Sequence, residues 1–156
     1  MKPNPSVEKN LIFLMAALVT ADATVNPESS SLLSIEKKIA FDQMLEERYA
    51  ELSFDRRQKR VAKTLRSMPP ITGGLSLLKR VERSSQKLTA GLDNDPRQAY
   101  GVLRQMLKLA QVERPANEKE QLIMRAMFVS MGLRAVAKLQ QAPDGRMVLK
   151  RRKSAA

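Results

Sequence analysis

The sequence predicts an all-α protein, a compact bundle of about six to seven helices. Three observations support this class. Apolar residues recur at helical spacing through most of the 156 residues, and strand-type alternation rich in Val, Ile, Thr and aromatics is absent. Nine Met against four Phe, two Tyr and no Trp are typical of a helical core filled by flexible side chains. We expect a single helical domain over residues 1–142 and a basic tail over 143–156.

The first half of the chain divides into three predicted helices. The first covers residues 6–23, with Ser6 as its cap, and it ends before Asn26-Pro27, which cannot continue a helix. The second covers 31–52 and carries a broad apolar stripe. The third runs from a cap at Ser53 or Asp55 to about residue 67. Its apolar residues follow one helical face and are Phe54, Val61, Leu65 and Met68.

Two further helices follow the break "MPPITGG" at residues 68–74. One covers residues 75–90. The next covers 96–112. Asp95 or Asn94 can cap it, and Pro96 suits its first position. Its apolar residues follow the i, i+3, i+4, i+7 spacing of a helix that packs on one side.

A sixth helix is predicted from residue 118 to about 131, with Asn117 as its cap. It is apolar on most sides, so we expect it to be central. Where it meets the preceding helix, four side chains should be buried: Met106, Leu107, Met127 and Phe128. Gly132 ends it, and a short further helix is expected over 134–141 before the basic tail "MVLKRRKSAA".

The segment "LIFLMAALVTADATVNPE" at residues 11–28 allows two interpretations. Lys2, an apolar run and the A-x-A site at 21–23 together resemble a secretory signal, so export after cleavage near Ala23 is the alternative. Pro3, Pro5 and Glu8 disfavour it, and the run is too short to span a bilayer. We expect this segment to stay as a helix of a cytoplasmic protein.

Two segments share one layout of apolar helix, short polar turn and second helix. They lie at residues 11–52 and 99–133, and aligning them places Ala21 with Ala110 and Asp22 with Gln111. The pattern predicts two helical hairpins in a pseudo-repeat. Because αα-hairpins are common, chance similarity is the alternative.

These two segments resemble the tellurite-resistance TerB-like domains. The similarity lies in the "ADATVNPE" turn with its flanking helices and in "LKLAQVERPANEKE" followed by "MRAMFVSMGL". The resemblance implies an all-helical fold of two hairpins related by a pseudo-twofold, with turns that read A-D-G before a later acidic residue. Ala23 replaces the usual Gly, and the second copy has Gln111 in place of the acid. Two carboxyls, Asp22 and Glu28, are far short of a calcium ligand set, so no metal site is expected.

Composition excludes several classes of chemistry. The chain has no Cys and no His, which removes thiol chemistry, disulfides, His-dependent catalysis and Cys/His metal sites. No nucleophile and base are positioned together, and "TGG" at 72–74 lacks phosphate-loop spacing. We therefore expect neither an enzyme nor a cofactor.

The net charge of +12 points to an acidic partner, and the excess of basic residues lies beyond residue 50. The densest stretch, "DRRQKRVAKTLR", holds Arg56, Arg57, Lys59, Arg60, Lys63 and Arg66. On a helix, Arg56, Lys59, Lys63 and Arg66 lie on one side and form one basic ridge. The tail adds a second patch: Lys150, Arg151, Arg152 and Lys153.

The predicted function is a non-enzymatic helical adaptor that assembles with another protein. The alternative is sequence-independent nucleic-acid binding through the basic helix and the tail. Four ridge contacts plus some from the tail imply a log–log salt slope of roughly −4 to −6 on duplex DNA. Docking on an anionic membrane surface is a third possibility. A basic helix can also be only a solvated face, and the sequence leaves the oligomeric state open.

Overall fold

The computed structural model describes residues 5–20, 42–43, 45–46, 52–67, 74–112 and 114–152. These residues form five α-helices, one 3₁₀ turn and a two-stranded antiparallel hairpin. The elements are α1 (Pro5–Thr20), α3 (Phe54–Ser67), α4 (Leu75–Gly91), α5 (Pro96–Ala110), α6 (Glu118–Ser130), η1 (Leu133–Ala135), β1 (Ala137–Gln141) and β2 (Met147–Arg151). The described part is therefore mostly helical, as predicted, but it has fewer helices than six to seven and it contains a small sheet.

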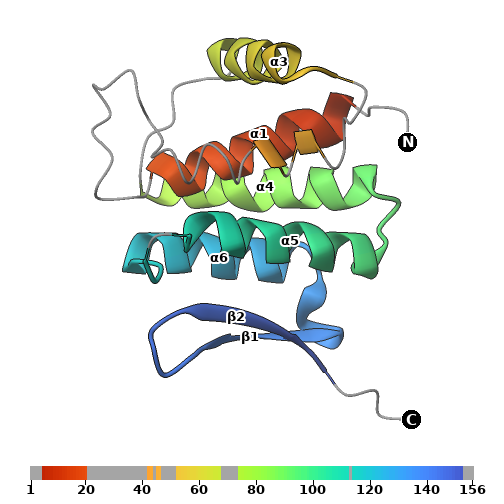
Figure 1. The fold of residues 1–156 in the computed structure, drawn as a ribbon. Coiled ribbons are helices and arrows are strands. Elements are labelled where there is room, and N and C mark those ends of the chain that lie inside the picture. The colour runs from red at the N-terminus through yellow and green to blue at the C-terminus, as the bar shows by residue number, and fades with distance from the viewer. Residues whose placement is uncertain are drawn as a thin grey trace.

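The elements are stacked in layers (Figure 1). α3 lies at one end, α1 and α4 pack side by side beneath it, α5 and α6 follow, and the β-hairpin closes the opposite end. The core runs through the four middle helices, and α1 contributes most to it. Its completely buried side chains are Leu11, Ile12, Leu14, Met15 and Leu18. Because α1 is buried on nearly every side, a fold without it would expose the inner faces of α4 and α5.

The sequence predicted that the helix at residues 118–131 would be central, and this is wrong in part. Ile123, Met124 and Met127 of α6 are buried, but Leu122 is 55% and Val129 45% exposed. α6 therefore packs with one face only, and α1 occupies the central place. None of the described helices is both long enough and apolar enough to cross a membrane.

The starts of α5 and α6 follow their local sequence signals. Asp95 accepts a hydrogen bond from the backbone N–H of Arg97 at 2.9 Å, and Pro96 takes the first helical position. Asn117 and Glu120 form a reciprocal capping box. The Asn117 side chain accepts from the Glu120 N–H at 2.8 Å, and Glu120 Oε1 accepts from the Asn117 N–H at 3.0 Å. Both predicted caps are confirmed.

The second predicted hairpin exists as α5, a turn and α6. Met106, Leu107 and Met127 are buried, as expected, whereas Phe128 is only half-buried at the edge of the core. The turn and most of the second helix of the first hairpin, residues 21–41, lie outside the described residues. The pseudo-repeat therefore stays a prediction.

The helix predicted over residues 134–141 is wrong. Gly132 ends α6 in the left-handed conformation (φ 71°), and after η1 the chain becomes strand β1. Residues 147–151, expected in the basic tail, form β2, with Leu139 opposite Leu149. The hairpin crosses the expected boundary between residues 142 and 143, and its turn contains Gly145 at φ 89°. Burial of Met147 and Leu149 against the helices explains the difference, because local helix preference is weaker than this packing.

Candidate polyanion-binding surfaces

Among the described residues, helix α3 contacts the rest of the protein along the side that carries Arg57, Arg60 and Val61. It begins at Phe54, where Ser53 Oγ accepts a hydrogen bond from the Arg56 N–H at 3.3 Å and Asp55 stands in the first turn. Val61 is buried and faces the core. Phe54, which the sequence placed on the buried side, is 57% exposed. The contact of α3 with the body is therefore narrow, and most of its surface faces water.

The α3 ridge, Arg56, Lys59, Lys63 and Arg66, is exposed as the helical spacing predicts. Within the part of the chain that the structure describes, none of these four side chains forms an ion pair. From Arg56 to Arg66 the ridge covers about 15 Å along the helix axis. Its positive charge is accordingly available to a ligand in solution.

Arg57 belongs to the same basic stretch but has a different role. Its Nε and Nη2 donate to the two carboxylate oxygens of Asp42 at 2.9 Å each, and Nη1 donates to the Leu52 carbonyl. The residue is 8% exposed. The hydrogen bond to Asp42 raises the pKa of Arg57 above its ordinary value. This guanidinium holds α3 to the preceding segment, so it does not belong to a binding surface.

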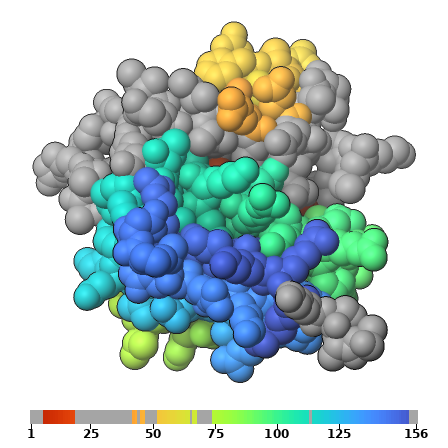
Figure 2. Space-filling model, turned by 60° about the horizontal axis from the view of Figure 1, so that its bottom comes forward, coloured from red at the N-terminus to blue at the C-terminus, as the bar shows by residue number. Residues whose placement is uncertain are grey.

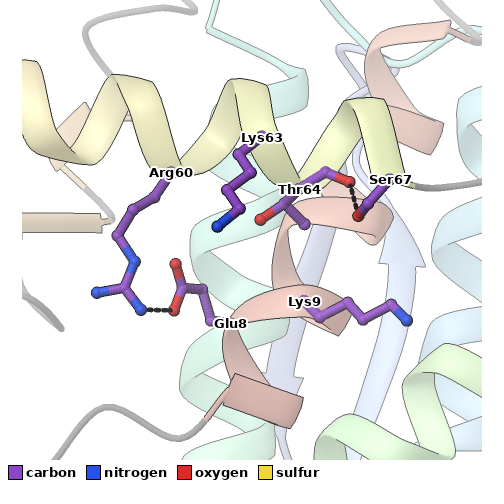
Figure 3. A pocket seen from close by; sticks show the side chains of 6 residues that line it. All are labelled: Glu8, Lys9, Arg60, Lys63, Thr64 and Ser67. Carbon is purple, nitrogen blue, oxygen red and sulfur yellow. Dashed lines mark hydrogen bonds and ion pairs between the residues drawn. The ribbon is translucent and has the colours of Figure 1, made fainter.

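Arg60 links α3 to α1. Its Nη2 donates to Glu8 Oε2 at 2.8 Å, and Glu8 stands in the first turn of α1. The two residues flank a pocket of about 440 Å³ between these helices (Figure 3). Figure 3 shows Arg60 and Lys63 reaching from α3 toward Glu8, whereas Lys9 points away along α1. Thr64 and Ser67 complete the lining, and Ser67 Oγ donates to the Thr64 carbonyl at 2.8 Å.

The predicted tail quartet is divided between two faces of the β-hairpin. Lys150 lies on the outward face, directly opposite Lys138. Arg151 faces the helices, with its guanidinium carbon 5.1 Å from the centre of the Tyr100 ring. Arg152 Nε donates to the carbonyls of Arg134 and Ala137, at 2.7 and 3.2 Å. Lys153 lies outside the described residues.

Neutral hydrogen bonds fasten this hairpin to the helices. The Gln111 amide donates through Nε2 to the Met147 carbonyl at 2.9 Å and accepts through Oε1 from the Met147 N–H at 2.6 Å. Tyr100 Oη donates to the Leu149 carbonyl at 3.1 Å. Gln111 is the residue aligned with Asp22 in the repeat. An amide side chain can both donate and accept hydrogen bonds, whereas an ionised carboxylate can only accept them. Gln111 therefore binds both the carbonyl and the N–H of Met147 in β2, which an Asp at this position could not do.

Sequence reasoning missed a set of basic residues beside the hairpin. Figure 2 shows the hairpin (blue) across one face of the molecule, next to α5 (green). This helix contains no acidic residue, and its three cations are exposed. They are Arg97, Arg104 and Lys108. Lys138 of β1 was also missed. The absence of acids from α5 is visible in the sequence, but the place of Lys138 depends on the strand register.

The described residues contain no group of three or more acidic side chains that could hold a metal ion. Asp22 and Glu28 lie outside the described residues. Comparisons of the chain with protein-family models, with curated proteins and with solved structures find no match. The resemblance to TerB-like domains therefore remains a prediction from the sequence.

Proposed function

We propose that the protein binds nucleic acid through the phosphate backbone, without reading sequence, and that the α3 ridge is a principal contact. The observation that carries this proposal is the set of four exposed cations on one side of an outer helix, none of them in an ion pair within the described residues. Phosphate contacts of this kind supply most of the affinity of non-specific binding and carry no sequence information.

The other two arginines of α3 support this role indirectly. Arg57 and Arg60 each pair with a carboxylate on the body of the protein, Asp42 and Glu8. These pairs fix the rotation of α3 about its axis and so keep Arg56, Lys59 and Arg66 exposed, while Lys63 is exposed at the edge of the pocket between α3 and α1. Binding through the ridge requires no cofactor and no catalytic step.

A protein-adaptor role is the second candidate, and one observation favours it. Leu122 and Val129 are exposed on one side of α6, and Val136 is exposed just beyond it. Exposed apolar side chains grouped in this way are typical of contact surfaces between proteins. The adaptor role becomes the leading candidate if nucleic acid does not bind.

Fluorescence anisotropy with labelled duplexes of unrelated sequence, measured across a salt series, tests the proposal. The ridge makes four phosphate contacts, so we expect a log–log slope of roughly −3 to −4 on duplex DNA. The steeper slope expected from the sequence also counted phosphate contacts from the basic tail. Part of that tail is strand β2 of the hairpin, which lies at the other end of the molecule and cannot contact the same straight duplex (Figure 1). Unrelated duplexes should bind alike.

A matched pair of variants separates the ridge from the overall charge. The ridge variant changes Arg56, Lys59, Lys63 and Arg66 to Gln. The control changes four exposed cations of α4 and α6 to Gln. These are Lys79, Arg83, Lys87 and Arg125. Both carry the same net charge, yet only the ridge variant should flatten the salt slope. Equal losses in the two variants, or no duplex binding by the natural protein at about 0.1 M salt, would refute the proposal.

A further inference from the structure

We infer that one molecule bridges two nucleic-acid segments, with the outward face of the β-hairpin as its second phosphate-binding surface. This inference rests on the proposed function of the α3 ridge. It assigns a separate role to residues of β1 and β2 and adds an activity, the joining of two segments, that a single surface cannot provide.

The outward face of the hairpin concentrates positive charge without compensation. Lys138 and Lys150 lie directly opposite each other in the register, and both are exposed. Like charges in such a cross-strand pair destabilise a sheet, since their Cβ atoms lie only about 5 Å apart. Neither strand contains an acidic residue. A phosphate held between the two ammonium groups would remove this repulsion.

Other basic residues extend this face. Arg152 continues it past the end of β2, where its backbone N–H donates to the Val136 carbonyl and its Nε to the Arg134 carbonyl. Arg134 is itself exposed. A two-stranded ribbon is, like a helix, an element that can enter the major groove. Because Arg152 already donates to two carbonyls, Lys138 and Lys150 are the main contacts of this face, about two against the four of the α3 ridge. Duplex binding through the hairpin alone should therefore be weaker and less dependent on salt than binding through the ridge.

The position of the two surfaces requires two separate ligands. α3 and the hairpin stand at opposite ends of the stack, with the layers α1–α4 and α5–α6 between them (Figure 1). Adjacent helix layers are about 10 Å apart, which puts the two surfaces roughly 30 Å from each other. Screening at physiological salt acts over about 8 Å, so each surface binds independently of the other. A straight duplex that lies on one surface cannot reach the other.

A capture assay tests this inference at about 50 mM salt, where phosphate contacts are strong. One duplex is fixed to beads, and a second labelled duplex of unrelated sequence is captured only if a protein joins the two. The natural protein should capture it. The ridge variant described above and a hairpin variant, Lys138→Gln with Lys150→Gln, should each still bind a single duplex in the anisotropy assay. Neither should capture the second duplex above the level measured without protein.

Controls make each outcome decisive. Lys79→Gln with Lys87→Gln removes the same charge as the hairpin variant from α4, and it should capture normally. The hairpin variant should also melt no earlier than the natural protein, because it loses only a repulsive pair. If either single-surface variant captures the second duplex as well as the natural protein, bridging occurs by self-association and the inference is wrong. The inference is also wrong if the natural protein binds a single duplex but does not capture the second one. If the natural protein binds no duplex at all, the proposed function itself is refuted.

Discussion

The α3 helix and the β-hairpin are both basic and both lie at the surface, yet they are held to the protein by different interactions. Within the described residues, α3 is fixed by two ion pairs, Arg57 with Asp42 and Arg60 with Glu8, and by the buried Val61. The hairpin is fixed to the helices by the buried side chains of Met147 and Leu149 and by hydrogen bonds that are not ion pairs. The donors or acceptors of these bonds include Gln111, Tyr100, Arg146 and Arg152.

This difference shows how a protein with an excess of basic residues can expose positive charge at two ends. In α3 the few nearby carboxylates neutralise the arginines that face the body, and the remaining cations are left to the solvent. In the hairpin the side toward the helices is mostly apolar, so its lysines stand on the other side of the pleat. Salt and single substitutions should therefore affect the two regions differently.

The largest effect should come from the support of the hairpin. Gln111→Ala removes the partners of the Met147 N–H and carbonyl and of the Ala116 N–H, so we expect a loss of roughly 2–4 kcal/mol in the free energy of unfolding. Urea denaturation measures this loss. Gln140→Ala, on the exposed side of β1, is the control and should change stability by less than about 0.5 kcal/mol. Equal effects would show that the hairpin does not depend on Gln111.

A local effect should follow from loosening α3. Arg57→Ala breaks both hydrogen bonds to Asp42 and the one to the Leu52 carbonyl, so amide hydrogen exchange in α3 should accelerate and the melting temperature should fall. The neighbouring Arg56→Ala removes an exposed cation with no ion pair in the described residues and should change neither quantity. Exchange that is equally fast in both variants would contradict the assignment of Arg57 as the residue that holds the helix.

The smallest effect should come from salt alone. Raising NaCl from about 0.15 M to about 1 M shortens the screening length from about 8 Å to about 3 Å, which weakens the partly exposed Arg60–Glu8 pair. Such pairs contribute about 0–1 kcal/mol, so amide protection in α3 should decrease slightly. Protection in β1 and β2 should not decrease, because apolar contacts and hydrogen bonds to carbonyl and amide groups, rather than ion pairs to the helices, hold them in the described residues. A parallel decrease in both regions would remove the distinction between them.

Local signals explain why some elements could be predicted from the sequence. α5 and α6 were placed correctly, since Asp95-Pro96 and the Asn117–Glu120 pair are complete capping signals within a few residues. The exposure of the four α3 ridge residues also followed from helical spacing alone. The roles of Arg57 and Arg60 could not be predicted, because their partners Asp42 and Glu8 are 15 and 52 residues away in the chain.

By itself, the sequence determined the mostly helical class, the two capped helices and the positions at which α3 exposes its cations, because helical periodicity and caps act over a few residues. Only the tertiary structure decided that residues 137–151 form a hairpin, that α1 is the central helix and that the two basic surfaces lie at opposite ends. These features depend on contacts between distant segments, such as Gln111 with Met147 and α1 with α4. Such pairings are set by which surfaces can be buried together, and no local spacing encodes them.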